Sequence, residues 1–169
     1  MPFQPIPPRD MRIALVVSRY HAFVTDRLVA GARAALQEAG LAERDVEVFA
    51  VPGAYELAQA AHRIAESRAF AAVVCLGCVI RGETPHFEYI ANAAAHGITH
   101  AAQTTGVPIT FGVLTTNTAD EALARAGDGQ ANKGREAAAA AIEMARLYSR
   151  APGQRSGSRS RKGKPARKR

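Results

Sequence analysis

The sequence predicts a three-layer α/β fold, in which a four-stranded parallel sheet carries helices on both faces. Two observations predict it: strand-like and helix-like segments alternate along the chain, and two of the strand segments are continuous apolar runs. Such alternation is typical of parallel sheets, and strands covered on both faces lose the alternation of polar and apolar residues. With 169 residues, 47% of them hydrophobic, the chain is long enough for one domain with a substantial core.

The first half of the chain contains two strand–helix units. Residues 12–18 (RIALVVS) predict a buried strand, and residues 25–39 predict a helix with its apolar side chains on one face and a stop at Gly40. Residues 46–51 (VEVFAV) predict the second strand. A helix over residues 55–67 completes the second unit, again with one apolar face.

The second half adds two more strands and three helices. Residues 71–80 (AAVVCLGCVI) predict the third strand, and a helix over 86–105 follows after a short polar break. Residues 108–114 (PITFGVL) predict the fourth strand. A capping-box pattern at 118–121 opens a short helix, and the alanine-rich segment 132–148 predicts the last one.

The basic charge is concentrated at one end of the chain. Nine of the 22 lysines and arginines lie in residues 150–169, which contain no acid, so residues 1–149 carry thirteen basic and fifteen acidic side chains, a net charge of −2. Because residues 150–169 also lack apolar side chains, they predict a disordered tail. A solvated tail is favoured over a weak, salt-sensitive contact with RNA. We therefore divide the chain into an N-terminal extension (1–11), one domain (12–149) and a basic tail (150–169).

The cysteines and the N-terminal residues indicate the compartment. Cys75 and Cys78 lie three apart in the predicted third strand, on opposite faces, and no second pair follows. We interpret them as buried small hydrophobic residues in a reducing compartment. Residues 1–10 contain four prolines and no long apolar run, which does not fit a signal peptide. No segment approaches the length of a membrane span, and the expected location is the cytoplasm.

Residues 79–89 (VIRGETPHFEY) are the strongest candidate for an active site. They lie beyond the carboxyl end of a predicted parallel strand, where open sheets bind small ligands. The backbone N–H groups of Glu83 and Thr84, at a helix start, can bind an anion such as phosphate. His86 adds the side-chain type whose ordinary pKa lies nearest neutrality. A lone histidine is more often a capping or surface residue, but these neighbours favour a catalytic role.

Other strand ends also carry groups suited to a ligand, although none is specific alone. Tyr20 can stack on a flat heterocycle or close the core. Glu56, after a Pro-Gly turn, can hold a polyol or an amide-like ring, or serve as an ordinary acid in the first turn of a helix. Phe111 lies within the fourth strand, and Arg125 and Lys133 come after it.

Four segments together resemble the signature blocks of the lumazine synthase family. They are residues 51–61 (VPGAYELAQAA), 77–98 (GCVIRGETPHFEYIANAAAHGI), 111–127 (FGVLTTNTADEALARAG) and 132–138 (NKGREAA). The resemblance implies a flavodoxin-like domain and a transferase of riboflavin biosynthesis. Family members condense 5-amino-6-(D-ribitylamino)uracil with 3,4-dihydroxy-2-butanone 4-phosphate, release water and phosphate, and need no metal or organic cofactor.

The resemblance also implies a role for individual residues. His86 is implied as the proton-transfer residue, Glu83 and Thr84 as phosphate ligands through their N–H groups, and Arg125 as the side chain that pairs with the same phosphate. The pyrimidine and its ribityl chain are implied to contact a larger set, which consists of Tyr20, Ala54, Tyr55, Glu56, Cys78, Val79, Ile80, Phe111 and Lys133. His21 follows Tyr20 where many members have asparagine, and its role stays open.

Members of the family assemble as pentamers, decamers or sixty-subunit shells, with each site between neighbours. The resemblance therefore implies that Phe111, His86 and Arg125 face residues of another subunit, and that part of the set is supplied in trans. Two other functions remain open. Lys133 can form a Schiff base, as in an aldolase, if it lies in an apolar pocket. The chain can also be a non-catalytic binder of flavin or lumazine, against which His86 and Arg125 argue.

Overall fold

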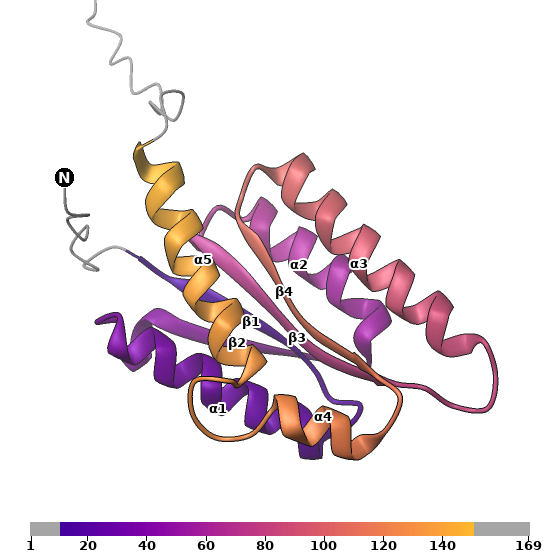
Figure 1. Cartoon of the computed structure of the whole chain (residues 1–169). Helices are drawn as coiled ribbons and strands as arrows, with labels where there is room; N and C mark the ends of the chain where they lie inside the picture. The colour runs from indigo at the N-terminus through magenta and orange to yellow at the C-terminus, as the bar shows by residue number, and fades with distance from the viewer. Residues whose placement is uncertain (1–10, 151–169) are drawn as a thin grey trace, which may run out of the picture.

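The computed structural model describes residues 11–150, which form the expected three-layer α/β fold (Figure 1). Its strands are β1 (Ile13–Ser18), β2 (Val46–Val51), β3 (Ala72–Ile80) and β4 (Ile109–Thr116). Its helices are α1 (Ala22–Glu38), α2 (Leu57–Glu66), α3 (His86–Thr105), α4 (Ala119–Arg125) and α5 (Lys133–Arg150), with short 3₁₀ turns η2 (Glu43–Asp45) and η3 (Ala54–Glu56). The predicted extension and tail lie outside the described residues except for Met11 and Arg150, the last residue of α5.

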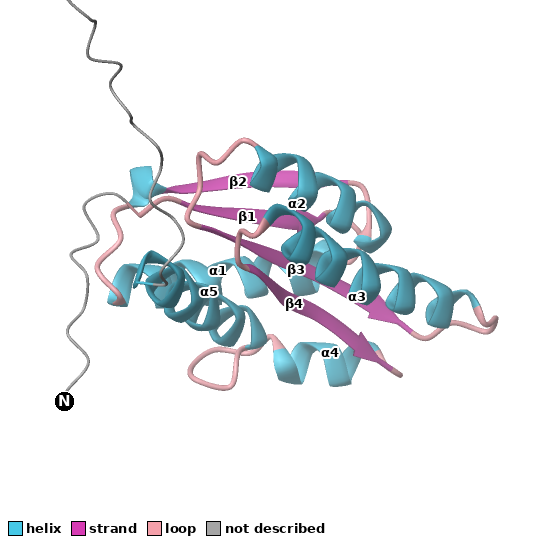
Figure 2. Cartoon of the chain, turned by 90° about the horizontal axis from the view of Figure 1, so that it is seen from above, coloured by secondary structure: helices cyan, strands magenta, loops and turns pink. Residues whose placement is uncertain are grey.

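The sheet is parallel throughout, and its strand order is β2-β1-β3-β4, as in flavodoxin-like folds (Figure 2). Ser18 at the end of β1 pairs with Val51 at the end of β2, and Ile80 at the end of β3 pairs with Thr116 of β4. The carboxyl ends of the strands therefore share one edge of the sheet. The loops that follow β1, β2 and β3 leave from this edge and build the candidate site.

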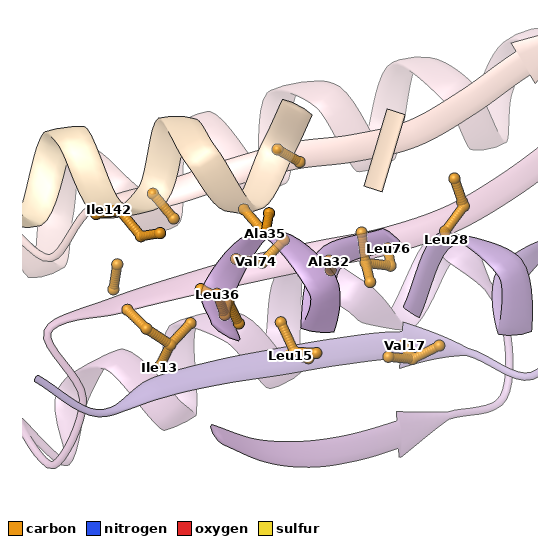
Figure 3. Packing of buried hydrophobic residues seen from close by; sticks show 14 of the residues in the cluster. Ile13, Leu15, Val17, Leu28, Ala32, Ala35, Leu36, Val74, Leu76 and Ile142 are labelled. Carbon is orange, nitrogen blue, oxygen red and sulfur yellow. The ribbon is translucent and has the colours of Figure 1, made fainter. Parts of the chain in front are cut away.

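The sheet separates two hydrophobic clusters. Ile13, Leu15 and Val17 of β1 pack toward α1 and α5, as Figure 3 shows. Ala14 and Val16 pack on the other side, in the cluster that contains α2. Both sets are buried, which explains why residues 12–18 read as one apolar run. The helices divide accordingly, with α1, α4 and α5 on one face and α2 and α3 on the other (Figure 2).

The two cysteines are buried on opposite faces of β3, as predicted. Cys75 belongs to the cluster with α2, and Cys78 to the cluster with α1. Both are free thiols, and burial raises the pKa of Cys75 to about 12 and that of Cys78 to about 11. Desolvation disfavours the thiolate, so both side chains are neutral at physiological pH.

Two helices start away from the predicted residue, and one predicted capping box is only half formed. The helix predicted from residue 55 begins as the 3₁₀ turn η3, and α2 follows from Leu57. The first helix begins at Ala22, not Thr25, because His21 turns the chain with a φ of 60° and Thr25 lies one turn inside, buried. At α4, Thr118 accepts a hydrogen bond from the N–H of Glu121, as a capping box requires. The Glu121 carboxylate, however, accepts from the N–H of Asn117 rather than Thr118. No helix within residues 11–150 is long and apolar enough to cross a membrane.

Candidate active site

A cavity of about 830 Å³ opens at the carboxyl edge of the sheet. The loops after β1 and β2 form one side of it, and the end of β3 with the start of α3 forms the other. Nine of the residues expected in the site line this cavity, namely Tyr20, Ala54, Tyr55, Glu56, Cys78, Val79, Ile80, Thr84 and His86. These nine residues come from three segments that lie far apart in the chain, and the fold brings them to one cavity.

Backbone hydrogen bonds hold the first two loops together. The N–H of Arg19 donates to the carbonyl of Val51 at 2.9 Å, and the N–H of Tyr20 donates to that of Pro52 at 3.2 Å. These bonds continue the β1–β2 pairing past the strand ends. They bring the Tyr20 ring, which is 67% exposed, to the same cavity as the turn that carries Glu56.

His21 supports the Tyr20 ring from the side. Its left-handed backbone conformation is one that histidine and asparagine adopt more readily than most residues, so the position suits either residue. The His21 ring meets the Tyr20 ring edge-on at 4.5 Å between centroids and the Phe23 ring at 5.8 Å. Partial burial lowers the pKa of His21, which keeps the ring uncharged at neutral pH.

The segment between β3 and α3 presents unpaired donors to the cavity. Residues 81–86 are exposed, and within residues 11–150 no acceptor is bonded to the N–H groups of Glu83 and Thr84. They precede the positive end of the α3 dipole, a favourable place for an anion. His86 is the first residue of α3. Glu83 itself does not line the cavity, but its neighbours Gly82 and Thr84 do.

The remaining three predicted residues lie elsewhere, in a second cavity of about 510 Å³ beside the edge strand β4. Phe111 is 44% exposed there, and Arg125 and Lys133 lie around it. The Arg125 guanidinium donates to the carbonyl of Glu121 at 2.9 Å. The Lys133 ammonium pairs with both carboxylate oxygens of Glu136, each at 2.8 Å. Within a single chain, Arg125 and Lys133 therefore lie in a different cavity from His86.

The buried side chain of Asn132 holds together the segments next to the second cavity. Its amide nitrogen donates to the carbonyls of Arg27, Ala126 and Gly127 at 3.0 to 3.1 Å. Its amide oxygen accepts from the N–H groups of Gly134 and Arg135, at the start of α5. A Cβ at Gly134 would clash with the Leu28 carbonyl of α1, so only glycine allows this approach. Lys133 is thus fixed between a buried cap and a close helix contact.

The structure adds several wall residues that the sequence did not single out. In the first cavity these are Gly53, Arg81, Gly82, Phe87 and Ile90, and in the second cavity they include Glu136. Phe87 and Ile90 belong to the apolar positions of α3 that recur at spacings of three and four, with Ala94 and Ile98. The three-residue spacing of Lys133 and Glu136 on a helix is the signal that could have identified their ion pair.

The fold and this site together define a class of protein. An open parallel sheet, an aromatic ring at the mouth of a cavity, free N–H donors at a helix start and a nearby histidine are the features of an α/β enzyme. The cavity suits a flat, polar ligand together with an anionic group.

Comparison with known proteins identifies the family. The model of the 6,7-dimethyl-8-ribityllumazine synthase family matches residues 10–149. A protein of Syntrophus aciditrophicus (strain SB) named 6,7-dimethyl-8-ribityllumazine synthase is 49% identical over 139 residues, which are 82% of this chain and 90% of the relative. The chain belongs to the 6,7-dimethyl-8-ribityllumazine synthase family, and it is a transferase of riboflavin biosynthesis.

Proposed function

We propose that the chain condenses 5-amino-6-(D-ribitylamino)uracil with 3,4-dihydroxy-2-butanone 4-phosphate in a site shared by two copies of itself. The observation that carries the proposal is the separation of the two cavities. The first holds the stacking ring, the free N–H donors and His86, whereas the second holds Arg125 and Lys133. The first cavity contains neither Arg125 nor Lys133 of its own chain, and the one guanidinium in its wall, that of Arg81, is already paired with Glu88.

The first cavity supplies the pyrimidine site and the proton transfers. The Tyr20 ring stacks on the pyrimidine, and the turn from Ala54 to Glu56 holds the ring and its ribityl chain. The N–H groups of Glu83 and Thr84 bind the phosphate. His86 moves protons as the pyrimidine amine adds to the ketone, water and phosphate leave and the new ring closes. Holding both substrates together contributes much of the acceleration.

The second cavity, from a neighbouring copy, completes the site. Arg125 pairs with the phosphate through its planar guanidinium, Phe111 covers the pyrimidine, and Lys133 stabilises negative charge that develops on it. Since two different surfaces meet, the interface is head-to-tail, and such an interface forms a ring when the rotation between neighbours closes. We infer a pentameric ring with residues 12–149 as its catalytic domain. The exposed Lys133, paired with Glu136, does not fit the apolar pocket that a Schiff base requires.

The free thiols are compatible with a reducing compartment. Cys75 and Cys78 are free, and free thiols persist in reducing compartments. We infer that the enzyme works in the cytoplasm.

Mixing two variants that each impair one wall tests the shared site, with the butanone phosphate kept well below its KM for Arg125→Ala. His86→Ala and Arg125→Ala subunits, unfolded together and refolded, are expected to form rings in which about a quarter of the sites combine an intact first wall with an intact second wall. Lumazine formation, followed by product fluorescence with both substrates, should recover toward that fraction. A mixture of His86→Ala with His86→Gln is the matched control and should recover nothing. Equal inactivity of both mixtures contradicts a shared site.

Arg125→Ala alone tests the phosphate contact. We expect a larger rise in KM for the butanone phosphate than for the pyrimidine, because loss of a charge-assisted pair costs about 1.5 to 3 kcal/mol. Steady-state kinetics with each substrate varied in turn measures the difference. Arg44→Ala removes another exposed arginine, one that lines neither cavity, and should change neither KM. Equal weakening for both substrates makes Arg125 a structural residue.

A further inference from the structure

Arg81 is the one arginine in the wall of the first cavity, and its side chain joins three segments of the chain. Its Nε donates to the side-chain oxygen of Asn117 at 3.0 Å, in the turn before α4. Its terminal nitrogen lies 3.4 Å from a carboxylate oxygen of Glu88, in the first turn of α3. Its guanidinium carbon lies 4.8 Å from the centre of the Phe87 ring. The backbone N–H of Arg81 also donates to the carbonyl of Thr116 at 2.9 Å.

These contacts matter because little else restrains the segment that carries His86. Residues 81–86 are all exposed, and Pro85, the N-cap of α3, makes no side-chain cap bond. Within residues 11–150, no other side-chain hydrogen bond ties the segment from 81 to 88 to the rest of the chain. Phe87 and Ile90 pack on the core, but none of residues 81–85, which lead into the helix, belongs to either hydrophobic cluster.

We propose that Arg81 is a positioning residue: it clamps the first turn of α3 through Glu88 and Phe87 and anchors that turn to Asn117. The clamp sets where His86 and the N–H groups of Glu83 and Thr84 lie relative to the pyrimidine wall. The Arg81 side chain makes no hydrogen bond, ion pair or cation–π contact with Tyr20 or Glu56, which form that wall. This inference rests on the roles proposed above for His86 and for the phosphate-binding loop.

Arg81→Ala is expected to lower kcat by about ten- to a hundredfold, since small misplacement of reacting groups has effects of that size. KM for the butanone phosphate should rise, and KM for the pyrimidine should stay within about twofold. The Glu88→Gln and Asn117→Ala variants should each show the same pattern in weaker form. Adding Glu88→Gln to Arg81→Ala should cause no further loss, because both variants break the same clamp.

The chain offers a matched control at Arg12. Arg12 pairs with Glu47 at 2.8 Å and lies 4.7 Å from the centre of the Phe70 ring, and its side chain is as exposed as that of Arg81. Arg12→Ala therefore removes the same two kinds of contact away from the cavity. Its activity should equal that of the unmodified protein, and its melting temperature should fall by an amount similar to that of Arg81→Ala.

Three results overturn the inference. Unchanged kinetics of Arg81→Ala, in a protein that His86→Ala inactivates, leave the proposed function intact and remove Arg81 from it. Normal activity of both Glu88→Gln and Asn117→Ala, with Arg81→Ala impaired, makes Arg81 a direct ligand of the phosphate. A large fall in melting temperature together with equal rises in both KM values makes it a general structural residue.

Discussion

Replacing His86 by alanine is expected to lower turnover by roughly ten- to a thousandfold while the fold stays intact, because a positioned general acid or base contributes about that much. His86 is exposed at the first position of α3, and its ring makes no hydrogen bond to residues 11–150. Its removal therefore breaks no structural contact. Product fluorescence at saturating concentrations of both substrates measures the change.

His100 provides the control for this prediction. It is exposed on the same helix, α3, but lies outside the first cavity. His100→Ala should retain full turnover, and both variants should melt at nearly the temperature of the unmodified protein. An unchanged rate for His86→Ala would remove this residue from the mechanism and with it the main chemical role of the first cavity.

The largest effect on stability is expected from Asn132→Ala. Asn132 is 3% exposed and makes five hydrogen bonds. Its loss removes the hydrogen-bond partner of three carbonyls and of two N–H groups at the start of α5. We expect the free energy of unfolding to fall by about 3 kcal/mol or more. That corresponds to a fall in melting temperature of roughly 6 to 12 °C for a domain of this size.

Two further variants separate the contributions of Asn132. Asn92→Ala removes an exposed asparagine on α3 and should leave the melting temperature nearly unchanged at equal protein concentration. Asn132→Asp keeps the oxygen that caps α5, but it places a second oxygen against the carbonyls of Arg27, Ala126 and Gly127. It should therefore not restore stability. Wild-type stability of Asn132→Asp would show that the three donor bonds contribute little.

The fold class was predictable because apolar runs and helical spacing, which are local sequence patterns, indicate the strands and helices. The buried runs in β1 and β3, and the helical spacing after each strand, follow from burial on both faces of the sheet. The order β2-β1-β3-β4 was not predicted from these patterns, because periodicity shows which faces of a strand are buried but not which strands are neighbours. The apolar spacing placed the first helix from residue 25 onward, whereas α1 begins three residues earlier at Ala22, after the left-handed turn at His21, and Thr25 is a buried side chain inside it.

The site was predictable in part, for a related reason. Residues that follow β1, β2 and β3 meet at one edge because parallel strands end together. Phe111 does not reach this edge. It pairs with Cys75 part of the way along β3, before the carboxyl ends of the strands, and its side chain is exposed on the edge strand β4. The contacts of Arg81 join residues as far as 36 positions apart, and no local pattern encodes such a pair. Long-range polar contacts are therefore what the sequence alone left undetermined.

Cys78 has a consequence for the chemical durability of the enzyme. Its sulfur belongs to the wall of a cavity that, on the proposed function, receives a ketone, and thiolates attack carbonyl carbons readily. With its pKa raised to about 11, about one Cys78 thiol in ten thousand is ionised at pH 7. Only the thiolate is strongly nucleophilic, so the Cys78 side chain should not react with the ketone and acts as a small apolar residue of the cavity wall. The same burial should make the active site tolerant of oxidants and alkylating agents that inactivate enzymes with exposed thiols.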